Sequence, residues 1–592
     1  MDNFMYRSSS PSCDCDYMEF TKENVIKALH MLSLGATKEA DDYLHSFQQS
    51  NCAWFIAEDI LSHVPHHEVP VLTFAAITFA KKIKQHINTL LGSELTALKE
   101  TLTRHLVRAS MIPESTPLVV QLGVCLSTLG LMSSNWDYEL EDFVKHLSGK
   151  PKHIMALLEV LKVLPEETRP SNLPLTGTDL KCVFQELRLQ SSYILNVLET
   201  ILERPDLPEG CLSKCLAVCG SWTRFGLVLP EQVLDRKLFQ RINIILVTPL
   251  DSAHLEAAEC VDAMLDQSRT ANKLDNRLNH LVFSLIPAFK RYGGDTKLLQ
   301  NYCQIFVNLF KTHFHVTQND LLKIQERMRT IQLLLLVAEH CPLELIETSI
   351  TVWSLLTQDL HMVRLYRNDF TRLLELLLPR TALPASYESI TRPDTMVTDR
   401  FRGLLSEVLV DLAPLVDVDA MEKLYDVVKN EQSPWNYVEV AIFFLRHLMV
   451  QFRERQPELI LKILDSVKHR PQAFIRLQVL ELISVPDTVD FVTIWRSLLN
   501  ELRRDVPMVA AIESRLSLLM PHWNYFLILA TMVDEFRLKE SDRCHLLASM
   551  CALLRELPPP DVMKVKMYMV NVEWTSCPAH IWENRVKVFK DI

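Results

Sequence analysis

Glycine is scarce in this chain. It accounts for 12 of the 592 residues, about 2%, whereas soluble proteins average roughly 7%. Tight β-hairpins and phosphate-binding loops depend on glycine, because glycine adopts left-handed backbone angles without steric cost. Leucine is frequent, and the alternation of apolar and polar residues that is typical of strands is rare. The sequence therefore predicts an all-α fold.

Prolines follow amphipathic segments at loosely regular distances. Pro65, Pro113, Pro165, Pro208 and Pro249 are separated by 48, 52, 43 and 41 residues. A degenerate period of roughly 40 to 47 residues with two helices per unit is typical of HEAT and armadillo arrays. In such arrays each helix pair covers its apolar surface by stacking on its neighbours. The period predicts a right-handed α-solenoid of HEAT-like helix pairs.

Apolar residues at three- and four-residue spacing predict where the paired helices lie. The predicted ranges are 22–33, 38–50, 52–63, 69–89, 95–108, 117–131, 154–164, 179–202, 211–225, 254–267, 277–292, 298–313, 321–340, 343–361, 370–378, 401–412, 435–452, 457–467, 473–483, 491–502, 522–533 and 541–556. The segment 379–399 is rich in Pro, Thr and Ser, and it is predicted to be a long loop.

The predicted helix 69–89 combines a wide apolar surface with a cluster of lysines. Its sequence includes VLTFAAITFAKKIK, in which two overlapping apolar stripes run along the helix. So broad an apolar surface must be covered on more than one side. Lys81, Lys82 and Lys84 then mark where the helix meets water or an anionic partner.

Charge and cysteine content restrict the classes of partner and compartment. The formal net charge is −11 and the isoelectric point is near 6.0, which argues against nucleic acid as the main partner and suits a basic protein. Most of the 14 cysteines lie on apolar helical faces, as expected in a reducing compartment. No signal-peptide core and no run of about 18 apolar residues is found, so we expect no membrane span and a location in the cytosol or nucleus.

Patterns that indicate catalysis or metal binding were sought, and the strong ones are missing. The sequence has no G-x-G-x-x-G, Walker loop, H-E-x-x-H or G-x-S-x-G. Three weaker groups lack the further ligands or the spacing that a zinc or calcium site needs: Cys13-Asp14-Cys15, His66-His67 and, in a predicted interhelical turn, Asp417-Val418-Asp419. We therefore expect no enzyme, no metal and no cofactor.

Seven segments follow one another along the chain: AWFIAEDILSH (53–63), FAAITFAKKIK (74–84), LLEVLKVLPEET (157–168), CGSWTRFGLV (219–228), HLEAAECV (254–261), NYCQIF (301–306) and VVKNEQSPWNYVEVAIFFL (427–445). This ordered set resembles the importin-β superfamily, and within it the branch of transportin-SR and importin 13. The resemblance runs in order from about residue 21 to about residue 570. It implies a disordered tail over 1–20, Ran-binding HEAT repeats over 21–150, an exportin-1/importin-like HEAT solenoid over 151–570 and a divergent tail over 571–592. Receptors of this branch are longer, and roughly the last third of their solenoid is not found here.

The resemblance implies a nuclear import receptor that shuttles between nucleus and cytoplasm. Such receptors pass nuclear pores by binding Phe-Gly nucleoporins and release cargo when Ran-GTP docks on their N-terminal repeats. In this family the second helix of repeat two lines the concave side, so Lys81, Lys82 and Lys84 are the predicted contacts for acidic patches on Ran. The alternative is that these lysines form only a solvated last turn of the helix.

Cargo and pore contacts are less constrained by the sequence. The branch carries serine/arginine-rich splicing factors, whose phosphorylated Arg/Ser tails bind an arginine-lined helix. The arginine pairs Arg453 with Arg455 and Arg503 with Arg504 do not match its position. Aromatic residues such as Trp54, Phe55 and Trp222 are more often core than nucleoporin slots. The rival hypothesis is a HEAT-repeat scaffold, or a truncated and cargo-deficient regulatory form, without Ran-dependent transport.

Overall fold

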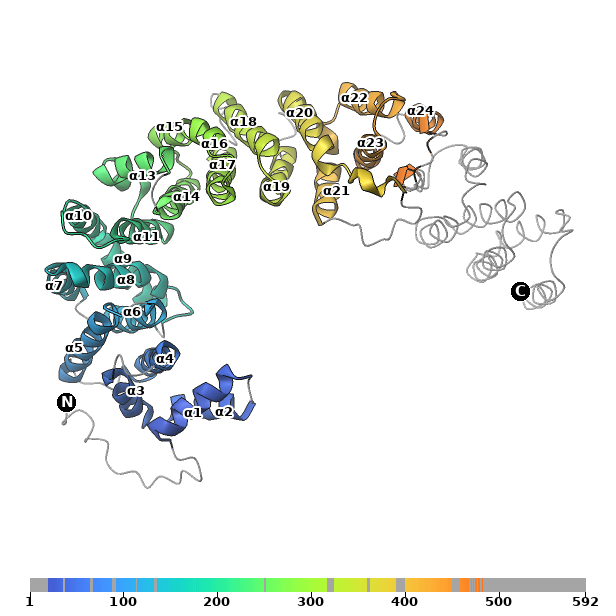
Figure 1. Cartoon of the computed structure of the whole chain (residues 1–592). Helices are drawn as coiled ribbons and strands as arrows, with labels where there is room; N and C mark the ends of the chain where they lie inside the picture. The colour runs from blue at the N-terminus through green and yellow to red at the C-terminus, as the bar shows by residue number, and fades with distance from the viewer. Residues whose placement is uncertain are drawn as a thin grey trace, which may run out of the picture. The chain divides into compact units, whose positions relative to one another are not determined.

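The computed structural model describes residues 20–482, apart from 36–37, 64–67, 88–91, 113, 133–135, 174, 176, 250–251, 317–323, 359–362, 390–399, 450–456, 468–469, 471, 473, 476–477 and 480–481. All regular secondary structure in these residues is helical (Figure 1), which confirms the all-α fold class. Residues 1–19 and 571–592 of the predicted tails lie outside the described residues, as do the predicted helices beyond 483, His66-His67 and both arginine pairs; Phe20, the last residue of the predicted N-terminal tail, packs against Tyr43 and Phe47. No described helix combines the length and apolarity that a membrane span requires.

The chain divides into two compact units, one ending at Thr330 and the other beginning at Ile331. In unit 1 the helices form two parallel rows, which follow opposite edges of the ribbon in Figure 1. Row A contains α1 (Lys22–Ser33), α3 (Ala53–Ser62), α5 (Gly92–Ala109), α7 (Trp136–Ser148), α10 (Ser191–Leu202), α13 (Lys237–Val247), α15 (Asn276–Ser284) and α16 (Ile286–Arg291). Row B contains α2 (Lys38–Gln49), α4 (Val69–His86), α6 (Thr116–Leu131), α8 (Pro151–Glu167), α11 (Cys211–Arg224), α14 (His254–Thr270) and α17 (Thr296–Val316). The short helices α9 (Gly177–Leu189) and α12 (Pro230–Leu234) connect the rows.

Row B is where unit 1 packs most closely. Each of its helices from α4 onward lies against the next one along the row, and the facing side chains are almost entirely buried and apolar. A single core cluster extends from Val25 in α1 to Val160 in α8. Helices therefore contact their neighbours in sequence order, as a one-dimensional stack requires. The solenoid of helix pairs is confirmed.

Polar contacts join successive helix pairs. In row B, Trp222 donates through Nε1 to the carbonyl oxygen of Leu161 at 2.8 Å, across 61 residues because α9 and α10 lie between α8 and α11 in the chain. On the surface, Arg236 pairs with Glu199 across 37 residues, at 3.2 Å. Lys273 pairs with Glu231 across 42 residues, at 3.1 Å. The repeat spacing predicted from prolines is thus visible in contacts between successive helix pairs.

Unit 2 continues the alternation. One set comprises α20 (Val363–Thr381), α22 (Val418–Lys429) and α24 (Pro457–Val467), and the other comprises α19 (Leu343–Ile350), η3 (Thr351–Gln358), α21 (Arg400–Leu412) and α23 (Trp435–Leu448). Helix α18 (Ile324–His340) crosses the division between the units, and two short 3-10 helices, η5 (Ala385–Ser389) and η7 (Ala413–Leu415), complete the described structure. Helix α22 packs on α23 and α24, and α21 packs on α23 and η3.

Several sequence predictions need correction. Pro165 lies inside α8 rather than after it, and the predicted helix 179–202 is divided at Gln190. Helices α7, α13 and α22 were not predicted. Asp417, expected in a turn, is the N-cap of α22 and accepts a hydrogen bond from the Ala420 amide at 3.0 Å. The predicted loop 379–399 begins inside α20 and includes η5, and 390–399 lies outside the described residues.

The two units do not test the predicted division at residues 150 and 151. That boundary lies inside unit 1, and it remains a prediction about family regions rather than about compact bodies.

Candidate functional site

Helix α4 carries the three lysines that the sequence singled out. Its buried stripe is the predicted one, because Leu72, Ala75, Ala76, Phe79 and Ile83 are all enclosed. Pro70 lies in the first turn of the helix, where its missing N–H costs no hydrogen bond. The helix packs on α3 on one side and on α6 on the other, with α2 near its polar edge. Its lysines therefore emerge between other helices rather than on an open face.

Lys82 is fully buried, with 0% of its surface exposed. Its Nζ donates to the carbonyl oxygen of Gln49, the last residue of α2, at 2.9 Å. The C-terminal carbonyls of a helix carry partial negative charge, so an ammonium group is favourable there. Burial lowers the pKa of Lys82, with Cys52 opposing and Lys81 adding to the effect. Lys82 is thus a structural cap of α2, and its predicted contact with a partner does not fit its burial.

Lys81 and Lys84 are only partly buried, and each has an internal partner. Lys81 donates to the side-chain oxygen of Gln48 at 3.2 Å. Lys84 forms an ion pair with Glu167 of α8 at 3.1 Å, and its side chain is 30% exposed against 9% for Glu167. The lysines thus tie α4 to α2 and α8, and Lys81 and Lys84 are the two that a partner can reach.

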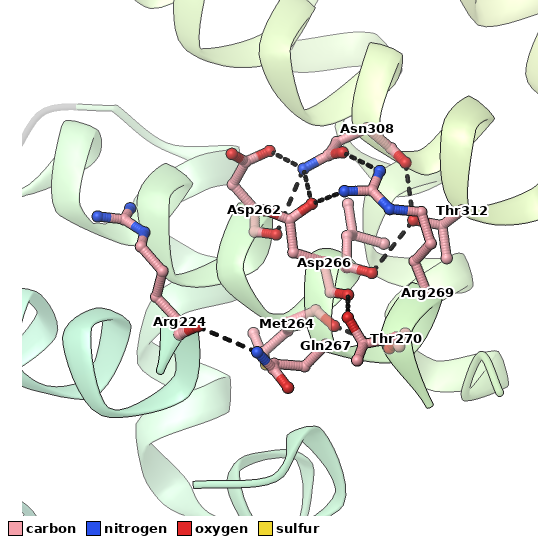
Figure 2. Close-up of polar contacts among 11 residues, drawn as sticks. Arg224, Asp262, Met264, Asp266, Gln267, Arg269, Thr270, Asn308 and Thr312 are labelled. Carbon is pink, nitrogen blue, oxygen red and sulfur yellow. Dashed lines mark hydrogen bonds and ion pairs between the residues drawn. The ribbon is translucent and has the colours of Figure 1, made fainter. Parts of the chain in front are cut away.

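A second cluster of charged residues lies on row B, on α14. Glu256, Glu259, Asp262 and Asp266 follow one face of this helix, while the opposite face buries Ala257, Val261 and other apolar residues. Figure 2 shows Asp262 and Asp266 pointing toward Asn308 of α17, with Arg224 of α11 on the other side. The stripe therefore lies where three successive row B helices meet.

Hydrogen bonds fix the acidic side chains in place. The Nδ2 group of Asn308 donates to the Asp262 carboxylate at 2.6 Å and to the Asp266 carboxylate at 3.1 Å (Figure 2). Arg269 donates to Asp266 and also to Oδ1 of Asn308. Arg224 lies 3.8 Å from Glu259. Two arginines against three acids, Glu259, Asp262 and Asp266, leave one negative charge, so this site suits a cationic group of a partner.

The protonation state of Asp262 is expected to change when such a cationic partner binds. The pKa of Asp262 is raised to about 6, chiefly by burial and also by the nearby Asp266, while the hydrogen bond from Asn308 opposes the rise. A cation that docks beside Asp262 would favour its ionised form and so lower this pKa again. Binding of a basic group is therefore expected to release a proton near pH 6 and to strengthen as the pH rises.

Replacing Asp262 with asparagine is expected to stabilise the protein at pH 7.5 by about 1–3 kcal/mol. The folded-state pKa, about 6, lies above the ordinary value of 3.8, so the native state holds the proton more tightly than the unfolded state. Stability from this group is therefore present at low pH and declines as the pH rises from about 4 to about 6. Urea unfolding of the wild type and the Asp262→Asn variant at pH 4 should show no gain in the free energy of unfolding. An equal gain at both pH values would contradict the assigned ionisation.

Sequence reasoning missed the α14 site, although a signal was present. Acids at 256, 259, 262 and 266 repeat at helical spacing, opposite a stripe of small apolar residues. The segment HLEAAECV (254–261) contributed only to the family resemblance. The partners Asn308 and Arg224 lie 46 residues after and 38 residues before Asp262, and no local pattern links them.

Comparison with known sequences finds one family model and several similar proteins. The family model described as exportin 1-like protein matches residues 115–261, a range that begins just before α6 and ends within α14. Importin-13 from Bos taurus and from Homo sapiens are each 24% identical over 462 residues, covering 72% of this chain and 47% of the relative. The mRNA transport regulator MTR10 of Saccharomyces cerevisiae is 22% identical over 515 residues, covering 80% of this chain and 50% of its own. The chain thus spans about half the length of the curated relatives it matches.

Solved structures with a similar chain path include importin-13 in its cytosolic state. That structure is 15% identical and has a TM-score of 0.49, over 84% of this chain and 62% of the other. The karyopherin Kap121p, bound to the extreme C-terminus of the phosphatase Cdc14p, is 10% identical with a TM-score of 0.45.

Proposed function

Because the chain belongs to the importin-β superfamily, we propose that it is a nuclear transport receptor of the importin class. It binds cargo proteins, passes nuclear pores by contacting Phe-Gly nucleoporins, and releases cargo when Ran-GTP binds. It shuttles between nucleus and cytoplasm. The observation that carries this proposal is the sequence match to importin-13, which covers 72% of the chain.

The proposed Ran surface is the exposed part of α4. Lys81 and Lys84 retain solvent access, whereas Lys82 is enclosed. Charges at the edge of an interface steer encounter and set register, and they add modest affinity. Two accessible lysines on a row B helix suit the acidic patches that the family resemblance assigns to Ran.

The proposed cargo surface includes the acidic stripe on α14. Its net charge favours basic cargo segments that carry no phosphate groups. Asn308 and Arg269 hold the two partly buried acids, Asp262 and Asp266, in fixed positions, so an incoming guanidinium meets a preformed site at little ordering cost. The acidic balance of the whole chain agrees with a basic partner.

The charge substitution that tests the Ran surface follows from the contacts. Lys81→Glu is expected to weaken Ran-GTP binding severalfold, mostly through slower association. Lys84 is left unchanged in this variant because its loss would leave the carboxylate of Glu167 without its cation. The measurement is surface plasmon resonance of Ran-GTP on the full chain at two salt concentrations.

The matched control is Lys145→Glu on α7, which changes the net charge by the same amount as Lys81→Glu. Lys145 is exposed and pairs with Glu141 within its own helix, so its loss changes net charge without touching α4. An equal loss of affinity in this control, or no loss in the α4 variant, would remove the assignment of the Ran surface to α4.

A further inference from the structure

The carboxylate of Glu167 lies where three successive row B helices meet. Glu167 is the last residue of α8, and it accepts from Nζ of Lys84 in α4 at 3.1 Å. Thr128 of α6 donates to the same oxygen of Glu167 at 3.5 Å, the outer limit of a hydrogen bond. One carboxylate therefore joins α4, α6 and α8, and Lys84 is the one cation among these contacts.

Other polar contacts across these seams are weaker. The Cys125 thiol donates to the Ala76 carbonyl at 3.3 Å, and the Ser127 hydroxyl reaches the Val160 carbonyl at 3.5 Å. Thiols are poor donors, and the second distance is long. Across the next seam, by contrast, Ser221 and Trp222 of α11 each donate to a carbonyl of α8 at 2.8 Å. Among the described residues, Lys84 and Glu167 thus form the charged contact across these seams, beside the apolar packing of α4 on α6 and of α6 on α8.

The ion pair of Lys84 and Glu167 also determines how much positive charge α4 presents to a binding partner. Lys84 is the one lysine of the three with a carboxylate partner, because Lys81 binds the neutral Gln48 side chain and Lys82 binds a backbone carbonyl. Glu167 is largely enclosed while Lys84 is partly exposed. An acidic group that approaches Lys84 thus meets an ammonium group whose charge is already neutralised by Glu167.

We propose that Glu167 competes with an acidic protein partner for Lys84. The partner must displace the Glu167 carboxylate from the Lys84 ammonium group, and this displacement loosens α4 and α6 from α8. The inference rests on the proposed function, in which the partner is Ran-GTP. It adds a regulatory step to that function. Contact at α4 is coupled to the packing of two further repeats, because the buried carboxylate loses its cation when the partner takes Lys84.

Glu167→Gln tests this competition directly. Glutamine is nearly isosteric and its side-chain oxygen can still accept from Thr128, so the fold is retained while the negative charge is removed. Affinity for Ran-GTP should rise about tenfold, and this gain should disappear in the double variant with Lys84→Gln. Glu203→Gln is the matched control, since Glu203 forms an exposed pair with Lys237 at 2.7 Å in row A, and no tightening is expected there.

Hydrogen exchange on the full chain provides the second readout. Addition of Ran-GTP should raise amide exchange at the C-terminal end of α8 in the wild type, and Glu167→Gln alone should raise it without Ran. If wild type binds Ran-GTP but Glu167→Gln binds it equally or more weakly, the proposed competition between Glu167 and Ran-GTP is contradicted, while the proposed function stands. If wild type does not bind Ran-GTP at all, the proposed function fails and the inference with it.

Discussion

Arg402→Met is expected to destabilise unit 2 by about 3–5 kcal/mol, because it leaves the buried carboxylate of Glu439 without its cationic partner. Glu439 on α23 is 0% exposed, and the Arg402 guanidinium on α21 donates to both of its oxygens at 2.8 Å. Arg402 also donates to the carbonyl oxygen of Thr381, which closes α20, at 2.7 Å. Its guanidinium lies 5.3 Å from the ring centre of Phe443. One side chain therefore holds three helices of unit 2 together.

The control and the rescue for this substitution lie close by. Arg400→Met on the same helix removes a side chain that is 90% exposed and lies 3.6 Å from Glu347, so its cost should stay below roughly 1 kcal/mol. The double variant Arg402→Met with Glu439→Leu removes both charges and should recover most of the loss. Chemical denaturation and amide exchange of α21 and α23 measure these differences. Equal costs for Arg402→Met and Arg400→Met would show that the pair is not buried as described.

Lys82→Glu is expected to cost about 3–5 kcal/mol, with local melting of the first helix pair. The substitution places a carboxylate against the Gln49 carbonyl, at the end of α2 where the helix dipole is negative. No water reaches this position, because Lys82 has no exposed surface. Amide exchange of α1, α2 and α4, together with thermal unfolding, gives the measurement.

Two neighbouring substitutions separate the causes. Lys82→Met keeps the apolar stem and loses one hydrogen bond, so its cost should be about 1 kcal/mol. Lys81→Glu changes the same charge at a half-buried position and should cost less than Lys82→Glu. If Lys81→Glu and Lys82→Glu destabilise equally, the burial of Lys82 is wrong. A charge reversal of all three lysines would therefore report on folding as well as on Ran binding, which is why Lys82 is left unchanged in the binding variants.

Helix positions could be predicted from the sequence wherever local signals were strong. The helix predicted over 22–33 is observed as Lys22–Ser33, because Thr21 caps it by accepting from the Asn24 amide at 3.2 Å. Helix α13 was missed; four of its eleven residues are isoleucine or valine, which have lower helix propensity than leucine or alanine. Packing on α14 and α16 makes that segment helical, and such packing cannot be read from a local pattern.

The candidate sites show the same limit more sharply. A lysine cluster at the end of a helix was predictable, but its distribution between buried and exposed positions was not. The carbonyl that binds Lys82 lies 33 residues earlier, and the acid that binds Lys84 lies 83 residues later. Acidic residues on α14 were readable by spacing, whereas the raised pKa of Asp262 depends on enclosure by α17.

The most direct test of the receptor function is equilibrium binding of the intact chain to Ran in its two nucleotide states. Isothermal titration with Ran locked in its GTP form, and in parallel with Ran-GDP, compares the two affinities under one set of conditions. We predict clear binding to Ran-GTP and at least about a tenfold weaker interaction with Ran-GDP, equivalent to 1.4 kcal/mol or more. Equal affinity for the two forms, or no binding to either, would contradict the proposed function.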